Sequence, residues 1–585
     1  MKARLFGAIA LMMASLQVNG ATPVKIFLNQ VGYYPDEEKV VVLEGIDEKA
    51  KLTVSNSKGK AVLKPNVARK AVSPWSEKTR FIVDISSLKT PGRYTIACEG
   101  EKSEFVIAKN ALHDLSVASL KLFYLMRTDV PIEAAYAGKY ARGVGHSDTH
   151  VLIHPSAASP GREANSVISS PLGWYDAGDY NKYVVNSAFS IGIMLASYEQ
   201  NKDYFKKLST NIPESRNATP DILDEMMFNL KWLLTMQDPE DGGVYHKLTT
   251  PNFEGFVMPS ECKQQRYVVA KSVTAALDFA AVMAQGARLL KGSSDYAGFA
   301  SQAETAAKRA YEWAKANPTA FYNQARLSQD FKPAVNTGTY GDMNARDERF
   351  WAATELYKLT ADGSYLEDAK AVKPARFNAP TWGNVAGLGT WAWIAQEGSE
   401  LHSEMLAQLK DYCDALVANV GTSSFQAPFG DKKSDFGWGC LAEGGCANGV
   451  ALMFADRYLE RGKYMRYALE NMDYILGRNA TGYCFVTGFG AKSPMHPIIA
   501  SRLPMVLRSR SRVCWWVVPI PVSRTSVTAT WSILRICQMS RILTWRGRMR
   551  PTRLPSTGMP RSWRWSAGLT RSREREERKD SFSRL

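Results

Sequence analysis

The sequence is poor in cysteine and has no long apolar run beyond its first residues. Its eight cysteines among 585 residues include no pair spaced as Cys-x-x-Cys, which excludes zinc ribbons and thioredoxin-like redox sites. Cys440 and Cys446 are close enough in sequence to bridge, but we expect most of the eight to be small buried residues. No later segment has the roughly 20 apolar residues of a membrane-spanning helix. We therefore expect no membrane span.

Acidic residues are missing from one long stretch of the chain. Between Ile498 and Glu574 there is no Asp or Glu, and from residue 498 onward 19 Lys and Arg stand against 4 Asp and Glu. Of the 73 basic and 57 acidic residues in the whole chain, 54 and 53 precede residue 498, so that part is nearly neutral. The net charge of +16 therefore belongs almost entirely to residues 498–585, and it does not indicate an anion-binding surface on the rest of the protein.

The first 21 residues have the layout of a secretory signal peptide. A basic start with Lys2 and Arg4 precedes an apolar run from Leu5 to Leu16, and small or polar residues follow. The run is too short to span a membrane, and no cysteine marks a lipid-attachment point. We expect a signal peptide at residues 1–21 and a secreted or periplasmic protein; a buried N-terminal helix is the alternative.

Two patterns follow along the chain. Residues 22–108 contain short β-branched runs separated by turn signals, typical of an immunoglobulin-like β-sandwich. From about residue 110 to about residue 477 the apolar spacing is helical; Thr219 and Pro220, for example, predict a helix start with a capping hydroxyl. We expect a closed double ring of helices that carries its function on loops at one end. A solenoid would need a fixed repeat period, which the sequence lacks.

Paired carboxylates mark residues 173–183 (GWYDAGDYNKY). Asp176 and Asp179 are three residues apart with Ala and Gly between them, in a predicted tight turn before a helix. Close carboxyl groups push their pKa values apart and can act together on one water molecule. Aromatic residues on both sides offer flat faces to sugar rings. Taken alone, the spacing is more often an Asx turn, a helix cap or part of a cation site.

The whole segment resembles the signature of glycoside hydrolase family 9, the cellulase family with an (α/α)6 barrel. Other segments resemble that family in the same order along the chain, as far as Pro497. They are residues 27–33 (FLNQVGY), 241–247 (DGGVYHK), 347–353 (DERFWAA), 476–479 (LGRN) and 486–490 (VTGFG). The resemblance implies a mainly α protein, with an (α/α)6 barrel at residues 109–497 that follows a small immunoglobulin-like β-sandwich at residues 22–108.

The resemblance also implies roles for single residues. Asp179 would be the general base that takes a proton from the attacking water, and Asp176 would help to hold that water. The candidates for the sugar-binding cleft are Trp174, Tyr175, His246 and Trp438. For a lone His or Trp, packing or a supporting hydrogen bond is an equally good explanation. The family inverts the anomeric carbon, which requires a carboxylic acid roughly 6.5–9.5 Å from the base. No cofactor is required; a structural calcium ion is compatible, and its ligands are unknown.

The resemblance stops after residues 493–497 (SPMHP). The family continues there with His, any residue and Arg, and later with a Tyr-x-x-Asn-Glu run whose Glu is the catalytic acid. Ile498 and Ala500 occupy the His and Arg positions, and the rest is rich in Arg, Ser, Trp and Pro. The chain as written therefore lacks the catalytic acid. One interpretation of residues 498–585 is a basic, aromatic tail for nucleic acid or membrane.

A shifted reading frame explains this tail better. If each codon starts on the third base of the written one, residues 498–500 can encode His-His-Arg, and residues 514–522 can encode Leu-Leu-Val-Gly-Gly-Pro-Asn-Pro-Gly. Residues 550–561 can encode Ala-Ser-Asn-Glu-Ile-Ala-Ile-Asn-Trp-Asn-Ala-Pro, with the missing Glu spanning the codons of Thr552 and Arg553. Separate stretches recover family-like sequence in one frame, so we infer a one-base deletion near codon 497. Such a tail needs no nucleic-acid partner.

These observations predict an inverting endo-β-1,4-glucanase, a monomer, acting on cellulose-like chains. The alternatives are xyloglucan, mixed-linkage glucan or a short oligosaccharide as substrate, and exo action in place of endo action, because loop lengths around the cleft decide the substrate. The non-enzyme alternative is a carbohydrate-binding protein that has lost catalysis; the missing Glu favours it, and the carboxylate pair opposes it. The expected partner is a β-glucan polysaccharide or oligosaccharide.

Overall fold

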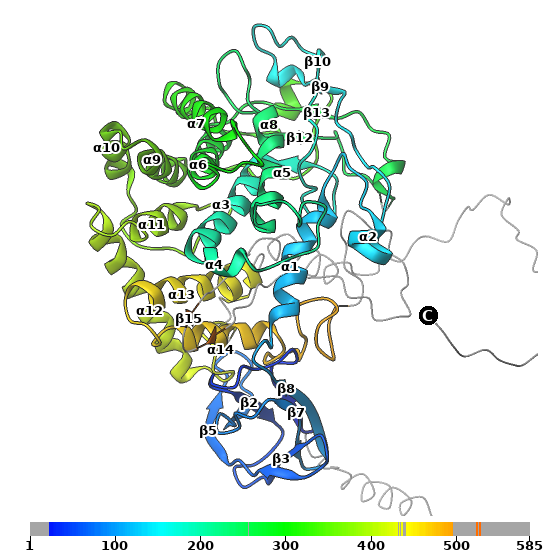
Figure 1. Ribbon diagram of the computed structural model, residues 1–585, viewed down its shortest axis with the longest axis vertical. Helices are drawn as coiled ribbons and strands as arrows, with labels where there is room; N and C mark the ends of the chain where they lie inside the picture. The colour runs from blue at the N-terminus through cyan, green and yellow to red at the C-terminus, as the bar shows by residue number, and fades with distance from the viewer. Residues whose placement is uncertain are drawn as a thin grey trace, which may run out of the picture.

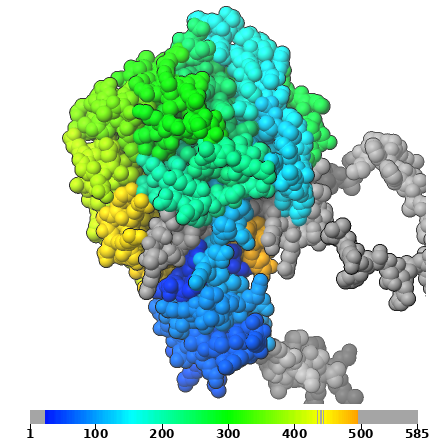
Figure 2. Space-filling view, viewed as in Figure 1, coloured from blue at the N-terminus to red at the C-terminus, as the bar shows by residue number. Residues whose placement is uncertain are grey.

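A computed structural model describes most of the chain between residues 23 and 494. The described residues are 23–255, 257–430, 432, 435–436 and 440–494, with two short paired strands beyond them, β14 (Val522–Ser523) and β15 (Ser526–Val527). Trp438, the predicted signal peptide and nearly all of the predicted out-of-frame tail lie outside them. Within the described part, no helix is long and apolar enough to cross a membrane. Figures 1 and 2 show a small β lobe below a larger helical lobe.

The N-terminal lobe is a sandwich of two antiparallel four-stranded sheets. Its strands are β1 (Lys25–Phe27), β2 (Val40–Glu44), β3 (Leu52–Asn56), β4 (Ala61–Leu63), β5 (Val67–Val72), β6 (Thr79–Asp84), β7 (Gly92–Cys98) and β8 (Glu101–Ile107). One sheet has the order β1-β2-β6-β5 and the other the order β4-β3-β7-β8. Alternate side chains, such as Tyr94 and Ile96 of β7, point into the shared core. This arrangement confirms the predicted immunoglobulin-like sandwich.

The larger lobe consists of helices that form the two rings of an (α/α)6 barrel. Within the described residues, its long helices are α1 (His113–Met126), α3 (Val184–Gln200), α5 (Asp221–Thr235), α6 (Val273–Leu289), α7 (Phe299–Ala316), α9 (Arg346–Thr360), α10 (Gly363–Val372), α11 (Ala386–Ile394), α12 (His402–Thr422), α13 (Asn448–Tyr458) and α14 (Met465–Ile475). Its shorter helices include α2 (Ala134–Ala137), α4 (Lys202–Phe205) and α8 (Gln324–Asp330). This arrangement confirms the predicted fold class.

The inner ring is the most buried part of the barrel. Helices α3, α6, α9 and α11 pack against one another in that order, and α7 and α10 cover α6 and α9 from outside. Every residue of α11 is buried, and so are all but two of α6. Six helical hairpins require twelve long helices, whereas the described residues supply eleven.

Helix α5 begins differently from the sequence-based expectation. Its first residue is Asp221, and no side chain caps the free N–H groups of its first turn. The hydroxyl of Thr219, the predicted cap, donates instead to Asp295 at 2.6 Å. The carboxylate of Asp221 takes over part of the cap's role, since negative charge is favourable at the N-terminus of a helix.

A small sheet next to the start of α3 was not predicted from the sequence. Its strands are β9 (Val151–Ile153), β10 (Val167–Ile168), β11 (Lys182–Tyr183), β12 (Lys247–Thr249) and β13 (Tyr267–Val268), in the order β10-β9-β13-β12-β11. Tyr183 of β11 pairs directly with Lys247 of β12. This register brings residues 173–183 and residues 241–247 together, and so joins two segments that the sequence analysis singled out.

The two lobes share a packed interface. Phe27 of the sandwich belongs to one apolar cluster with Phe425 and Tyr474 of the barrel. Next to it, Asn29 Nδ2 donates to Asp473 Oδ1 at 2.8 Å, and both residues are buried. The sandwich therefore supports α14, the last long helix that the structure describes.

Candidate active site

The paired carboxylates lie in a turn that is anchored at both ends. Gly173 begins the turn with φ +87°, and a Cβ there would lie 2.7 Å from the Trp232 ring, so only glycine fits without strain. The Gly173 carbonyl accepts from the Thr128 N–H at 2.9 Å. The Asp176 N–H donates to the Asn181 carbonyl at 3.1 Å, which closes the turn just before β11.

Asp176 is buried and held by donors from two distant segments. Asn186 Nδ2, in the first turn of α3, donates to Oδ1 at 2.9 Å. The Tyr340 hydroxyl donates to Oδ2 at 3.0 Å. Both carboxylate oxygens thus have a fixed direction, as a group that positions a water molecule requires.

Asp179 is half-buried, and it is oriented from the protein side. Its Oδ2 accepts from Asn181 Nδ2 at 2.7 Å and from the Tyr183 hydroxyl at 2.9 Å. The side-chain oxygen Oδ1 of Asn181 accepts from the Thr250 N–H at 2.9 Å, which fixes the side-chain amide so that its NH2 group faces Asp179. Burial raises the pKa of Asp179 above its ordinary range, while the bonds from Asn181 and Tyr183 pull it down. A carboxylate with a raised pKa is a stronger base.

His246 is buried behind the carboxylates, and both of its ring nitrogens are used. Nε2 lies 2.8 Å from the Thr339 carbonyl and must donate to it, so Nδ1 accepts from the Ser272 hydroxyl at 2.8 Å. The ring stacks on Tyr322 with centroids 4.0 Å apart. Burial lowers the pKa of His246 to about 3, so the imidazole is neutral. In this structure His246 anchors the loop that carries Tyr340; a direct contact with sugar remains a prediction.

Trp174 and Tyr175 support the turn from inside the barrel. The Trp174 side chain is 1% exposed, and its Nε1 donates to Glu225 Oε1 at 2.8 Å. Tyr175 is fully buried, and its hydroxyl accepts from the His146 N–H at 3.1 Å. Neither ring presents a face to solvent here. The expected sugar contact of these two rings remains a prediction, and the contacts seen are those of supporting side chains.

Trp382 is an aromatic candidate that the sequence analysis missed. It is only partly buried, and its ring meets Tyr340 edge-on with centroids 5.2 Å apart. Tyr340 in turn donates to Asp176. Tyr340 therefore lies between the Trp382 indole and the carboxylate of Asp176, and contacts both. Its position becomes evident only once the loop at residues 378–385 is placed beside the loop of Tyr340.

Other predicted site features lie outside the described residues or find no counterpart within them. Trp438 and the residues after Pro494 that bear on the catalytic acid are outside. Across the described ranges, no group of three or more His, Cys, Asp or Glu side chains is arranged to hold a metal ion. The compatible calcium ion therefore has no ligands that we can name.

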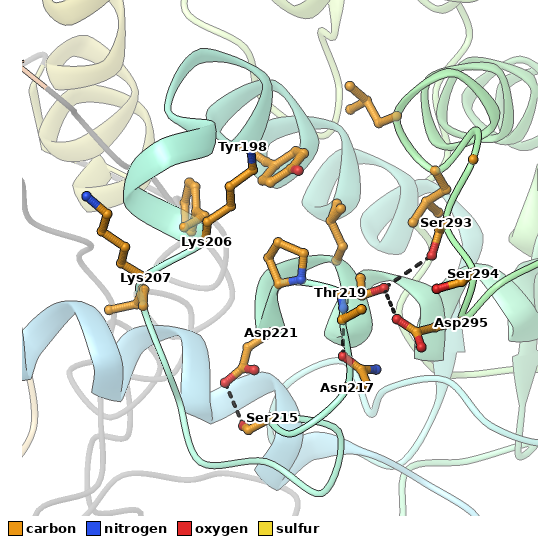
Figure 3. A pocket seen from close by; sticks show the side chains of 18 of the residues that line it. Tyr198, Lys206, Lys207, Ser215, Asn217, Thr219, Asp221, Ser293, Ser294 and Asp295 are labelled. Carbon is orange, nitrogen blue, oxygen red and sulfur yellow. Dashed lines mark hydrogen bonds between the residues drawn. The ribbon is translucent and has the colours of Figure 1, made fainter.

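The structure has a further cavity of about 740 Å³. Figure 3 shows some of the side chains that line it. It is lined by Tyr198 in the last turn of α3, and Thr219, Ser293 and Asp295 are hydrogen-bonded along its wall. Helix α3 has 17 residues and is therefore about 25 Å long. Asp179 precedes its first residue, so the cavity is at the opposite end of α3 and takes no part in the candidate active site.

Comparison with known proteins agrees with this geometry. The profile described as glycosyl hydrolase family 9 matches residues 113–502, and the one described as cellulase N-terminal ig-like domain matches residues 21–103. A xyloglucan-specific endo-β-1,4-glucanase of Bacteroides ovatus is 52% identical over 482 residues, which cover 81% of this chain and 82% of that protein. Endoglucanase D of Acetivibrio thermocellus is 30% identical over 490 residues, which cover 81% and 74%.

Solved structures give the same result. A structure described as Bacteroides ovatus GH9 superposes with a TM-score of 0.82 at 47% identity, covering 88% of this chain and 97% of that one. A metagenome-derived family 9 endoglucanase superposes with a TM-score of 0.74 at 29% identity, covering 82% and 88%. The fold and the family match together define a glycoside hydrolase of the six-hairpin barrel class. The chain belongs to glycosyl hydrolase family 9, and its relatives include endo-β-1,4-glucanases.

Proposed function

We propose that the carboxylate pair performs the base half of an inverting hydrolysis of internal β-1,4-glucosidic bonds. The supporting observation is that four donors from four different residues fix the two carboxyl groups: Asn186, Tyr340, Asn181 and Tyr183. Asp179 removes a proton from the water that attacks the anomeric carbon. Asp176 holds that water in line with the bond being broken.

The acid half is missing from the chain as written, and this determines which substrates test the proposal. An alcohol leaving group needs a proton from a carboxylic acid, whereas fluoride leaves without one. We therefore expect the written chain to hydrolyse β-cellobiosyl fluoride and to act very slowly on cello-oligosaccharides. In the fluoride reaction the C–F bond breaks, water oxygen bonds to the anomeric carbon, and the water proton goes to Asp179.

The test measures fluoride release together with the anomer of cellobiose by NMR. We expect α-cellobiose as the first product, because the mechanism inverts. Asp179→Asn should lower the rate about 100-fold or more, and the exposed Asp330→Asn serves as the matched control. Release at the buffer rate, or β-cellobiose as the first product, would contradict the proposal.

Xyloglucan is a second candidate substrate, because the Bacteroides ovatus relative that is 52% identical is described as xyloglucan-specific. The discriminating experiment uses the chain with its reading frame restored. Reducing-end release from xyloglucan, carboxymethylcellulose and mixed-linkage glucan is compared at equal mass. A rate on xyloglucan that exceeds the other two would favour it, and a preference for carboxymethylcellulose would favour the cellulase assignment.

Secretion is a further part of the proposal. Residues 1–21 would direct export and be removed, since they have the layout of a signal peptide. N-terminal sequencing of protein from the periplasm or medium would show a start near residue 22. Retention of Met1 in the cytoplasm would contradict this.

A further inference from the structure

Lys247 is a buried cation behind the carboxylate pair, and the mechanism so far gives it no role. It lies on β12 directly opposite Tyr183, and its side chain is fully buried. Its Nζ donates to Gln324 Oε1 at 2.7 Å, to Thr337 Oγ1 at 2.9 Å and to the Gly338 carbonyl at 2.6 Å. An ammonium has three N–H groups, so every one of them is used.

Two of these bonds fix a loop that reaches both carboxylates. The Gly338 N–H donates to the Tyr183 hydroxyl at 3.1 Å, and that hydroxyl donates to Asp179 Oδ2 at 2.9 Å. Two residues further on, the Tyr340 hydroxyl donates to Asp176 Oδ2 at 3.0 Å. A single ammonium thus holds residues 337–340 in the position from which Tyr183 and Tyr340 bind the pair.

The charge of Lys247 has no ion-pair partner of its own in the part of the chain described. Its Nζ lies 5.5 Å from the centre of the Tyr183 ring and 5.4 Å from that of Tyr322, and the adjacent His246 is neutral. Burial lowers the pKa of Lys247 to about 7, and the charge of Asp179 opposes that fall, so the ammonium is charged at the acidic pH where Asp179 titrates. Burying a cation without a partner costs free energy, and a Met or Leu of similar size would avoid that cost.

We propose that Lys247 is a positioning residue for the base. Its hydrogen bonds hold the loop at residues 337–340 against both carboxyl groups, and its positive charge favours the ionised form of Asp179. The proposal rests on the proposed role of Asp179. A lysine that only stabilised the fold would leave the pH dependence of the reaction unchanged. Lys247 should change it, because its charge acts on the ionisation of Asp179.

The test compares Lys247→Met with Thr337→Val on β-cellobiosyl fluoride from pH 3 to pH 8. Lys247→Met removes the charge and the bonds; Thr337→Val removes one acceptor and keeps the charge. We expect Lys247→Met to lower kcat at least tenfold and to move the acidic limb of kcat/KM to higher pH by about 1, since a cation lowers a neighbouring carboxyl pKa. Thr337→Val should lower kcat less and leave that limb in place.

The matched control is Lys308→Met on the outer helix α7, where the lysine is 43% exposed. This variant should change neither kcat nor the pH at which kcat/KM rises. If Lys247→Met melts at a lower temperature but has the same pH profile as the parent, Lys247 only stabilises the fold and the proposal is wrong. If Lys247→Met does not fold, Lys247→Gln, which keeps polar contacts without the charge, takes its place.

Failure of the proposed function would be distinguishable. If the parent chain releases no fluoride, the pKa of Asp179 is measured by NMR of 13C-labelled aspartate carboxyls, with the resonance assigned by its loss in Asp179→Asn. A higher Asp179 pKa in Lys247→Met than in the parent supports the action of the charge. Equal pKa values would overturn it.

Discussion

At the scale of single residues, the surroundings of Asp179 control its strength as a base. Burial raises its pKa, and the donors Asn181 and Tyr183 oppose that rise by stabilising the carboxylate. The group is therefore easier to protonate than an exposed aspartate. It can accept a proton more readily than an unperturbed aspartate does.

This balance predicts the pH dependence of the base half. Because Asp179 must be ionised to act, kcat/KM for β-cellobiosyl fluoride should rise with pH through its raised pKa, above the ordinary value of about 3.9. Tyr183→Phe removes a donor that favours the ionised form, so the limb should move further up. This account would be refuted if kcat/KM of the parent rose with a midpoint below pH 4, or if that midpoint were lower in Tyr183→Phe than in the parent.

Trp382 should act on substrate binding and leave the proton transfer alone. A half-buried indole beside Tyr340 offers a face for a sugar ring, and such stacking contributes about 1 kcal/mol or more. Trp382→Ala should raise KM for β-cellobiosyl fluoride several-fold while the acidic limb stays in place. Trp75→Ala, on the exposed surface of the sandwich, is the matched control. An unchanged KM in Trp382→Ala would exclude the contact.

Sequence reasoning found the carboxylates but not the residues that hold them. Asp176 and Asp179 stand in one short segment whose residue types are distinctive. Tyr340 is 164 positions away from Asp176, and Lys247 is known as a neighbour of Tyr183 only from strand register. Contacts between such distant segments depend on how loops fold, and no local pattern of residue types carries that information.

At the scale of elements, the turn before α3 is held by a close approach of backbone and ring. Gly173 has φ +87° and lies against the Trp232 side chain. Gly292 has a similar φ of +85°, but a Cβ there would meet nothing within 4 Å. An alanine at Gly292 would cost backbone strain alone, whereas an alanine at Gly173 would cost backbone strain and steric overlap together.

Gly173→Ala should therefore cost more stability than Gly292→Ala. We expect a loss of about 2–4 kcal/mol for Gly173→Ala, from backbone strain and overpacking together, and about 1 kcal/mol for Gly292→Ala. Urea unfolding measures both. Gly173→Ala should also slow fluoride release, since the turn carries the carboxylates. Equal losses of stability would show that the Trp232 side chain gives way.

The predictability of each element follows the spacing of its polar residues. Helix α5 has polar residues such as Asp224, Glu225 and Lys231 between its apolar ones, so the apolar positions repeat at helical spacing and predict the helix. Helix α11 (AGLGTWAWI) is buried at every position and contains two glycines, so no polar face reveals it. The strands β10, β11 and β13 have two residues each, which is too short for an alternation to be recognised.

At the scale of the whole molecule, the described part of the barrel has one long helix fewer than six hairpins require. The described residues supply eleven long helices, and the family match ends at residue 502, close to the inferred frame break. The sandwich packs on α14, the last long helix that the structure describes. We therefore expect both stability and the acid half of catalysis to depend on the reading frame.

Inserting one base near codon 497 tests this, because it would restore the His, the Arg, the catalytic Glu and the last helix together. We expect melting at a higher temperature, since a further helix packs on the core, and hydrolysis of glucan about 10²–10⁴-fold faster, since that is what a general acid contributes. Replacing the restored Glu by Gln separates the two effects. It should leave the melting temperature and fluoride release intact and abolish the gain on glucan, because only the alcohol leaving group needs the acid. A restored chain that melts no higher and gains no activity would mean that the tail as written is the native end of the barrel.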